Sequence, residues 1–105
     1  MNRHLTTLGL ARRAGRLIIG APMVCEALHS AHPPVYVFYA CDVSAPTERR
    51  LTSKCAYYKI PIMKLEASTE MLGNAVGKTG AVAAVALTDA GFLTALHLTD
   101  RKGRE

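Results

Sequence analysis

The hydrophobic residues of this chain alternate between two spacings, one typical of helices and one typical of buried strands. From Leu5 to Ala11 an apolar residue recurs every three or four positions, as on the buried face of a helix. Gly15 suits the position after a helix end, because glycine readily adopts the left-handed backbone conformation found there. The same reasoning, supported by capping residues and by prolines in first turns, predicts five helices. They lie at residues 3–14, between Gly20 and Pro33, between Asp42 and Lys59, between Ser68 and Gly77, and from Thr88 or Asp89 through Phe92, Ala95 and Leu96.

Four apolar runs between these helices predict strands. The runs at residues 35–41 and 81–87 contain no alternating polar positions, so both of their faces should be covered. We therefore expect core or near-core positions for Val37, Tyr39, Val82, Ala84 and Val85. The run at residues 60–63 includes Pro61, which lacks an N–H for a sheet and favours an edge position. A short strand at residues 16–19 completes the set.

The alternating order of helices and strands predicts an α/β domain. Such an order is typical of a central, mostly parallel sheet with helices on both faces, and here the sheet would have four strands and be mixed or mainly parallel. With 105 residues, half of them apolar, the chain is long enough for one domain with a real core. We assign this domain to residues 1–100 and expect residues 101–105 to form a frayed basic tail.

The charge of the chain is unevenly distributed. The formal net charge is +5, from 13 Lys and Arg residues against 8 Asp and Glu residues. Residues 1–25 contain no acid, and their arginines are Arg3, Arg12, Arg13 and Arg16. A positive field of this kind attracts polyanions such as nucleic acids or anionic lipid surfaces. Charge alone leaves a second interpretation equally open, that of a basic protein that is merely soluble.

Cysteine and histidine spacings argue against a metal or cofactor. Cys25, Cys41 and Cys55 form no C-x-x-C pair, so we expect buried, reduced thiols. His29 and His32 are followed by two prolines and have no further ligand nearby in the sequence. The first residues lack the apolar stretch of a secretory signal, and no apolar run is long enough to span a membrane. We therefore expect a cytoplasmic protein that has no cofactor and no membrane contact.

One segment imitates a nucleotide-binding motif. Residues 73–79 read Gly-Asn-Ala-Val-Gly-Lys-Thr, which is one residue short of the P-loop consensus. A P-loop leads from a strand into a helix, whereas this segment is predicted to lead from a helix into a strand. No nucleophile elbow or zinc-protease motif is present. We therefore expect a protein that is not an enzyme.

Several short motifs along nearly the whole chain together resemble one family. They are Leu-Gly-Leu-Ala-Arg-Arg-Ala-Gly-Arg at 8–16, Ile-Gly at 19–20, Asp-Val-Ser at 42–44, Leu-Gly-Asn-Ala-Val-Gly-Lys at 72–78 and Thr-Asp-Ala-Gly-Phe at 88–92. In this order and spacing the chain resembles the ribosomal protein L7Ae/L30e family, and most of all its small bacterial branch. The resemblance implies a three-layer α-β-α sandwich with a central four-stranded mixed sheet. It also implies binding to kink-turn RNA, a sharply bent duplex with tandem sheared G·A pairs and a bulge.

The resemblance further implies where RNA would bind. Gly20 would open a helix whose N-terminal N–H groups and positive dipole end face the phosphates, with basic side chains around it and a loop over a flipped base. The residues implied are Arg12, Arg13, Arg16, Gly20, Ala21, Pro22, Met23, Asp42, Val43, Ser44, Lys78, Thr79 and Gly80. Recognition would rest on RNA shape and splayed bases. The implied partner is a kink-turn-like or ribosomal RNA, with the ribosome as a candidate assembly and the protein itself a monomer.

The sequence departs from the family at the base-reading positions. Strong kink-turn binders follow the glycine with Thr, then Asn or Lys, then Glu or Gln, and carry a Lys three residues later. Here these places hold Ala21, Pro22, Met23 and Glu26, and the first three cannot hydrogen-bond a base edge through their side chains. Two hypotheses remain: an RNA-binding protein with more backbone-directed contacts, and a protein-interaction module on the same fold. Arg12, Arg13, Arg16 and Lys78 gathered around Gly20 would favour RNA, and an exposed apolar patch with Pro22 and Met23 would favour a protein partner.

Overall fold

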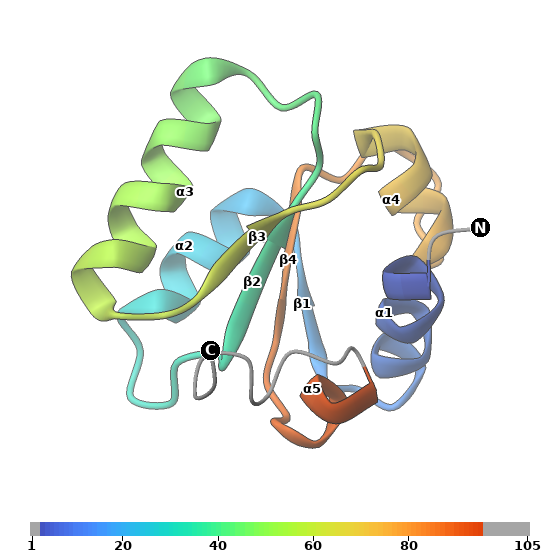
Figure 1. Cartoon of the computed structure of the whole chain (residues 1–105), viewed down its shortest axis with the longest axis horizontal. Coiled ribbons are helices and arrows are strands. Elements are labelled where there is room, and N and C mark those ends of the chain that lie inside the picture. The colour runs from blue at the N-terminus through green and yellow to red at the C-terminus, as the bar shows by residue number, and fades with distance from the viewer. Residues whose placement is uncertain (1–2, 96–105) are drawn as a thin grey trace.

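The computed structural model describes residues 3–95, which form one four-stranded sheet with helices on both faces. The strands are β1 (Leu17–Ile19), β2 (Tyr36–Tyr39), β3 (Ile62–Lys64) and β4 (Ala84–Leu87), in the sheet order β1-β4-β2-β3. The helices are α1 (Arg3–Arg13), α2 (Ala21–Leu28), α3 (Ala45–Tyr58), α4 (Thr69–Ala75) and α5 (Gly91–Ala95). Figure 1 shows α2 and α3 on one face of the sheet and α1 and α4 on the other. The predicted three-layer α-β-α sandwich with a mixed sheet is therefore confirmed.

The two central strands are apolar throughout because successive side chains of a strand point to opposite faces, and both faces are covered. Val37 of β2 and Ala84 of β4 pack with residues of α2 and α3. Phe38 of β2 and Val85 of β4 pack with residues of α1 and α4. The expected core residues Val37, Tyr39, Val82, Ala84 and Val85 are all buried, at 6 % exposure or less. The sequence prediction of the core is therefore confirmed.

The expectation of a mostly parallel sheet is wrong. Strand β4 lies between β1 and β2 and is antiparallel to both, and only β2 and β3 are parallel. The segment from β3 to β4, which contains α4, explains the antiparallel direction of β4. Before α4, the carbonyl of Ala67 accepts from the N–H of Cys41, and after α4 the carbonyl of Ala83 accepts from the N–H of Ala40. The chain thus leaves and re-enters the sheet at the same end, after β2. A strand that starts where the previous strand stopped must run antiparallel to it.

Strand β4 is shorter than the apolar run that predicted it. The run covers residues 81–87, but the strand starts only at Ala84. The N–H of Val82 donates instead to the carbonyl of Thr69 in α4, at 3.0 Å. Residues before Ala84 therefore belong to a loop that packs on α4.

One helix also differs from its predicted extent. Helix α2 ends at Leu28, before the expected stop at Pro33, because the chain turns at residues 29–32. The predicted continuation of the last helix at Leu96 and the tail at residues 101–105 lie outside the described residues. Their prediction stays untested.

The three cysteines differ in burial. Cys55 is fully buried on the inner face of α3, and Cys25 is partly buried on α2. Cys41 is exposed, because it lies two residues beyond the end of β2 and follows Ala40, the last buried residue there. The prediction of burial is therefore confirmed for Cys55 and wrong for Cys41.

Helices α1, α3 and α4 end with the same pair of backbone hydrogen bonds. After α1, Arg16 N–H donates to the carbonyl of Ala11 and Gly15 N–H to that of Arg12. This is the Schellman motif, which requires a left-handed residue after the helix. Gly15 and, after α4, Gly77 fill that place with positive φ angles of 75° and 78°. The predicted role of Gly15 at the end of α1 is therefore confirmed.

Lys59 takes the corresponding place after α3, with φ 59° and ψ 42°. A side chain in this conformation costs about 1–2 kcal/mol, which glycine avoids, although glycine also loses more entropy on folding. We expect Lys59→Gly to stabilise the fold by about 1 kcal/mol, measured as the free energy of unfolding in urea. Lys59→Ala removes the same charge but keeps the Cβ atom, so it should give no gain. Equal stabilisation by both variants would attribute the effect to charge and contradict the prediction.

Candidate nucleic-acid interface

Helix α2 begins at Gly20, directly after β1. Gly20 has a φ angle of 102°, a region that side chains disfavour. Its N–H donates to the carbonyl of Ala84 at 2.8 Å, and its carbonyl accepts from the N–H of Val24 at 2.9 Å. The first N–H groups of a helix have no partner within the helix, so the residues after Gly20 present donors and the positive dipole end. Pro22 in the first turn lacks one of these donors.

Three segments meet at this end of the sheet. They are the start of α2, the residues that follow β2 and the residues that precede β4. Gly20 is bonded to Ala84, and the neighbouring Ala83 carbonyl accepts from the N–H of Ala40 at 2.9 Å. Figure 1 shows the starts of α2 and α3 and the start of β4 together at the upper end of the sheet. The structure thus brings together the sequence-predicted segments around Gly20, Asp42 and the loop before β4.

Asp42 and Ser44 each cap a helix at this end. A carboxylate oxygen of Asp42 accepts from the N–H of Thr69, the first residue of α4, at 2.7 Å. The hydroxyl oxygen of Ser44 accepts from the N–H of Thr47 at the start of α3, at 3.3 Å. Both residues remain exposed, and Val43 between them is half-buried. This segment is therefore held in place by its own capping bonds.

Lys78, Thr79 and Gly80 lie in the loop that joins α4 to β4, and all three are exposed. The start of this loop is fixed because the N–H of Lys78 donates to the carbonyl of Gly73 at 2.9 Å. At Gly80 the loop is fixed by packing, because the carbonyl of Gly80 lies directly against Gly73. A Cβ atom on Gly73 would overlap this carbonyl. The exposed ammonium group of Lys78 is thus carried by a loop with two anchors on α4.

The arginines are not gathered around Gly20, contrary to expectation. Arg16 precedes β1, where its backbone carbonyl accepts from the N–H of Thr88 and its guanidinium lies 3.7 Å from the carboxylate of Asp89. Since β1 pairs with β4 along its length, Arg16 and Gly20 lie at opposite ends of the sheet. Arg12 and Arg13 lie in the last turn of α1, both exposed, just before the chain reaches Arg16. The extended strand β1 thus separates Gly20 from the arginines that precede it in the chain.

The surface around Gly20 is short of side chains that can read bases. Pro22 is exposed, and Met23 is 55 % exposed. Glu26, one turn further along α2, is exposed and acidic. Ala21 is partly buried against α3 and the sheet. The features expected for RNA and those expected for a protein partner are thus both partly present at this surface.

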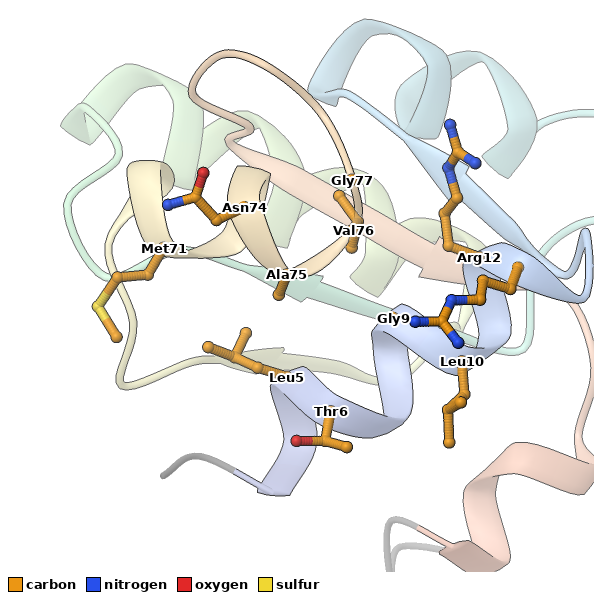
Figure 2. Close-up of a pocket in the computed structure, with 11 residues that line it drawn as sticks. Leu5, Thr6, Gly9, Leu10, Arg12, Met71, Asn74, Ala75, Val76 and Gly77 are labelled. Atoms are coloured by element: carbon orange, nitrogen blue, oxygen red, sulfur yellow. The ribbon is translucent and has the colours of Figure 1, made fainter.

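A second concave surface, not predicted from the sequence, lies between α1 and α4. Figure 2 shows this groove, which has a volume of about 690 Å³. Its residues are Leu5, Thr6, Gly9, Leu10, Arg12, Arg13, Met71, Asn74, Ala75, Val76 and Gly77. The periodicity of α4 places Met71 on a buried stripe, yet Met71 is 49 % exposed. The only sequence signal was Gly9 in the interior of α1, where glycine is otherwise unfavourable.

No constellation for catalysis or metal binding is found in the described part of the chain. Within residues 3–95, no three His, Cys, Asp or Glu side chains lie close enough to hold a metal ion. Burial raises the pKa of the Cys55 thiol to about 11, which disfavours the nucleophilic thiolate. Residues 73–79 lead from α4 toward β4, so the predicted direction, opposite to that of a P-loop, is confirmed. None of the helices between residues 3 and 95 is long and apolar enough to cross a membrane.

Comparison with known proteins gives consistent matches over most of the chain. Two curated relatives are named RNA-binding protein YlxQ. The one from Bacillus subtilis is 39% identical over 85% of this chain and 86% of its own length, and the one from Enterococcus faecium is 33% identical over 69% and 72%.

Two solved structures are similar as well. A protein of unknown function from Bacillus halodurans has 33% identity and a TM-score of 0.80, covering 92% of this chain and 96% of its own. The Giardia lamblia 15.5kD RNA binding protein has the same fold, with a TM-score of 0.78 at 16% identity, covering 96% and 86%. The ribosomal protein L7Ae/L30e/S12e/Gadd45 family matches residues 3–97. Since that match spans nearly the whole chain, the chain belongs to the ribosomal protein L7Ae/L30e/S12e/Gadd45 family.

Proposed function

We propose that this protein binds structured RNA of the kink-turn type through the sheet end where α2 begins. The observation that carries the proposal is that three segments are hydrogen-bonded to one another there: Gly20 before α2 bonds to Ala84, and Ala40 after β2 bonds to Ala83 before β4. Relatives that match most of the chain are named RNA-binding proteins, which supports the same function. The RNA partner is a ribosomal or regulatory RNA, and the protein acts as a monomer in the cytoplasm, where such RNA is found.

The chemistry of the proposed site is directed at the RNA backbone. Unpaired N–H groups at the start of α2 bind phosphate oxygens, and the positive end of the helix dipole adds to that attraction. Gly20 lets the RNA backbone approach closely, because no Cβ atom stands between it and the helix start. With Pro22 and Met23 in place of polar side chains, few contacts select particular bases. Binding is therefore governed by RNA shape and salt more than by sequence.

We also infer that the protein is not an enzyme, in line with its family and with the capping roles of Asp42 and Ser44. The second candidate function is a protein-interaction module centred on the same surface. Exposure of Pro22 and Met23 favours it. The RNA proposal is preferred because an isolated methionine and a proline do not form a large apolar patch, and because the relatives are named for RNA.

We expect Lys78→Ala to reduce the salt dependence of RNA binding. Loss of one phosphate contact lowers the slope of log K against log salt concentration by about 0.7–0.9. Arg16→Ala is the matched control: it removes one cation at the opposite end of the sheet, where Asp89 already pairs with it. Its slope should equal that of the unmodified protein. The measurement is an electrophoretic titration with a kink-turn RNA at several salt concentrations.

Two results would contradict this proposal. One is the absence of any RNA binding at low salt. The other is a larger loss of slope in Arg16→Ala than in Lys78→Ala, which would move the contact surface to the other end of β1.

A further inference from the structure

The groove between α1 and α4 has a shape that could accommodate one more helix. The two helices approach so closely at its floor that a Cβ atom on Gly9 would stand 2.6 Å from the carbonyl oxygen of Ala75. Small residues at the floor let an incoming helix approach deeply. Figure 2 shows Leu5 and Met71 toward one end of the groove and Arg12 and Gly77 toward the other. The groove is on the face of the sheet opposite α2.

The walls of the groove expose apolar side chains that a folded protein usually covers. Leu10 on α1 is 50 % exposed and Met71 on α4 is 49 % exposed. Both line the groove, together with Leu5. Burying such side chains under a partner removes apolar surface from water and favours association. An amphipathic helix with apolar residues at i, i+3, i+4 and i+7 is the standard occupant of a groove of this kind.

Charge selects among such helices. Arg12 and Arg13 line one end of the groove, and no acidic residue lines it. Within residues 3–95, neither guanidinium has a carboxylate within ion-pair distance. This is also the end where α1 and α4 both finish, so two negative dipole ends lie there. The first turn of an incoming helix suits this end, because it carries a positive dipole end and is stabilised by acidic side chains.

We propose that this groove binds a helical segment of a partner protein that has acidic residues in its first turn, followed by an apolar stripe. The helix lies antiparallel to α1 and α4. Its acidic turn meets Arg12 and Arg13, and its apolar stripe covers Leu10 and Met71.

The basic residues 101–105 do not suit this groove as an occupant. Residues 101–105 carry three cations and one acid, so their charge opposes the arginines of the groove. A second copy seated groove to groove would bring no acidic lining residue and would add two more arginines. Charge therefore favours a different protein.

The test uses fluorescence anisotropy with three synthetic peptides of about four helical turns. All share leucines at i, i+3, i+4 and i+7 on an alanine background. The first has two glutamates in its first turn, the second has them in its last turn, and the third has two lysines in its first turn. We expect the first peptide to bind at least about tenfold more tightly than the other two at low salt, with the difference shrinking as salt rises.

Variants of the protein locate the binding surface. Leu10→Glu should weaken the binding of the first peptide by at least about tenfold. Tyr57→Glu adds the same charge at a residue on α3 that is 78 % exposed, and it should leave this binding unchanged. Arg12→Glu with Arg13→Glu should reverse the preference, so that the lysine peptide binds best. Circular dichroism checks that each variant is folded, and a kink-turn RNA titration of Leu10→Glu should match the unmodified protein. That last readout separates this proposal from the RNA proposal, since either can fail alone.

Three outcomes would overturn the proposal. The first is equal binding of all three peptides, or none at millimolar concentration. The second is an unchanged preference after the double charge reversal. The third is concentration-dependent dimerisation that Leu10→Glu abolishes, observed by sedimentation, which would make a second copy the occupant.

Discussion

Gly73→Ala is expected to destabilise the fold by about 2–4 kcal/mol, more than any other single methyl addition at a glycine of the described chain. The added Cβ atom would overlap the backbone carbonyl oxygen of Gly80 and crowd the carbonyl carbon of the same residue at 3.1 Å. Backbone cannot swing away as a flexible side chain can, so the loop before β4 must shift as a whole. Overpacking of this kind commonly costs about 1–3 kcal/mol, and rigid backbone overlap lies at or beyond the upper end.

The measurement is thermal unfolding followed by circular dichroism. For a domain of this size, about 1 kcal/mol lowers the midpoint by about 4–8 °C, so a fall of at least roughly 10 °C is expected. Gly80→Ala is the matched control, because it adds the same methyl group to the other partner of the contact. A Cβ atom on Gly80 would meet no atom within 4 Å, so its midpoint should stay within a few degrees. Equal midpoints for both variants would show that the loop does not lie against α4 as described.

Gly73 also shows how the fold and the proposed site depend on one another. The loop that carries Lys78 is anchored on Gly73 by one hydrogen bond and by the close contact with Gly80. A glycine inside a helix therefore fixes the position of an exposed cation. The sequence motif at residues 73–79, which imitates a P-loop, is explained by helix packing and by the Schellman motif at Gly77.

The number, type and burial of the elements could be predicted from the sequence because they depend on local spacing. The unbroken apolar run at 35–41 indicated a strand covered on both faces, and Val37 and Phe38 face opposite layers as that requires. The direction of β4 could not be predicted in the same way. It depends on whether the chain, after α4, re-enters the sheet at the end that it left or at the opposite end. The hydrogen bonds of Ala40 and Cys41 show that it re-enters at the same end.

The parts of the site that depend on short sequence motifs could be predicted. The distances between site residues in the folded chain could not. Gly20 at the start of α2 and Gly77 before the loop were indicated by the residues themselves. The clustering of Arg16 with Gly20 was expected only from the family resemblance. A strand advances about 3.3 Å per residue, so the four steps from Arg16 to Gly20 span roughly 13 Å and place the two residues at opposite ends of the sheet. The groove between α1 and α4 was missed because helical periodicity cannot show that a neighbouring helix leaves Met71 uncovered.

The variant Pro22→Asn, Met23→Glu, Glu26→Lys is expected to bind a standard kink-turn at least about tenfold more tightly than the unmodified protein. The three residues are exposed in α2, so the changes need no repacking of the core. Asn restores a backbone N–H at the helix start that Pro22 lacks. The new side chains supply the donors and acceptors that the family resemblance places against the G·A edges. A base-edge contact is worth about 1–3 kcal/mol in the analogous DNA case, so even one new contact gives the expected gain.

The design of that experiment must separate base reading from charge. The triple variant raises the net charge by one, and Glu66→Gln raises it equally at an exposed residue outside the proposed site. An electrophoretic titration against a kink-turn and a straight duplex compares the two variants with the unmodified protein. If the gain comes from stronger attraction to phosphates, both variants should bind both RNAs more tightly. If it comes from base reading, only the triple variant should gain affinity, and only for the kink-turn. If the triple variant is folded by circular dichroism and its preference between the two RNAs is unchanged, the start of α2 is not where this protein meets RNA. The proposed function would then have to rest on another face of the fold.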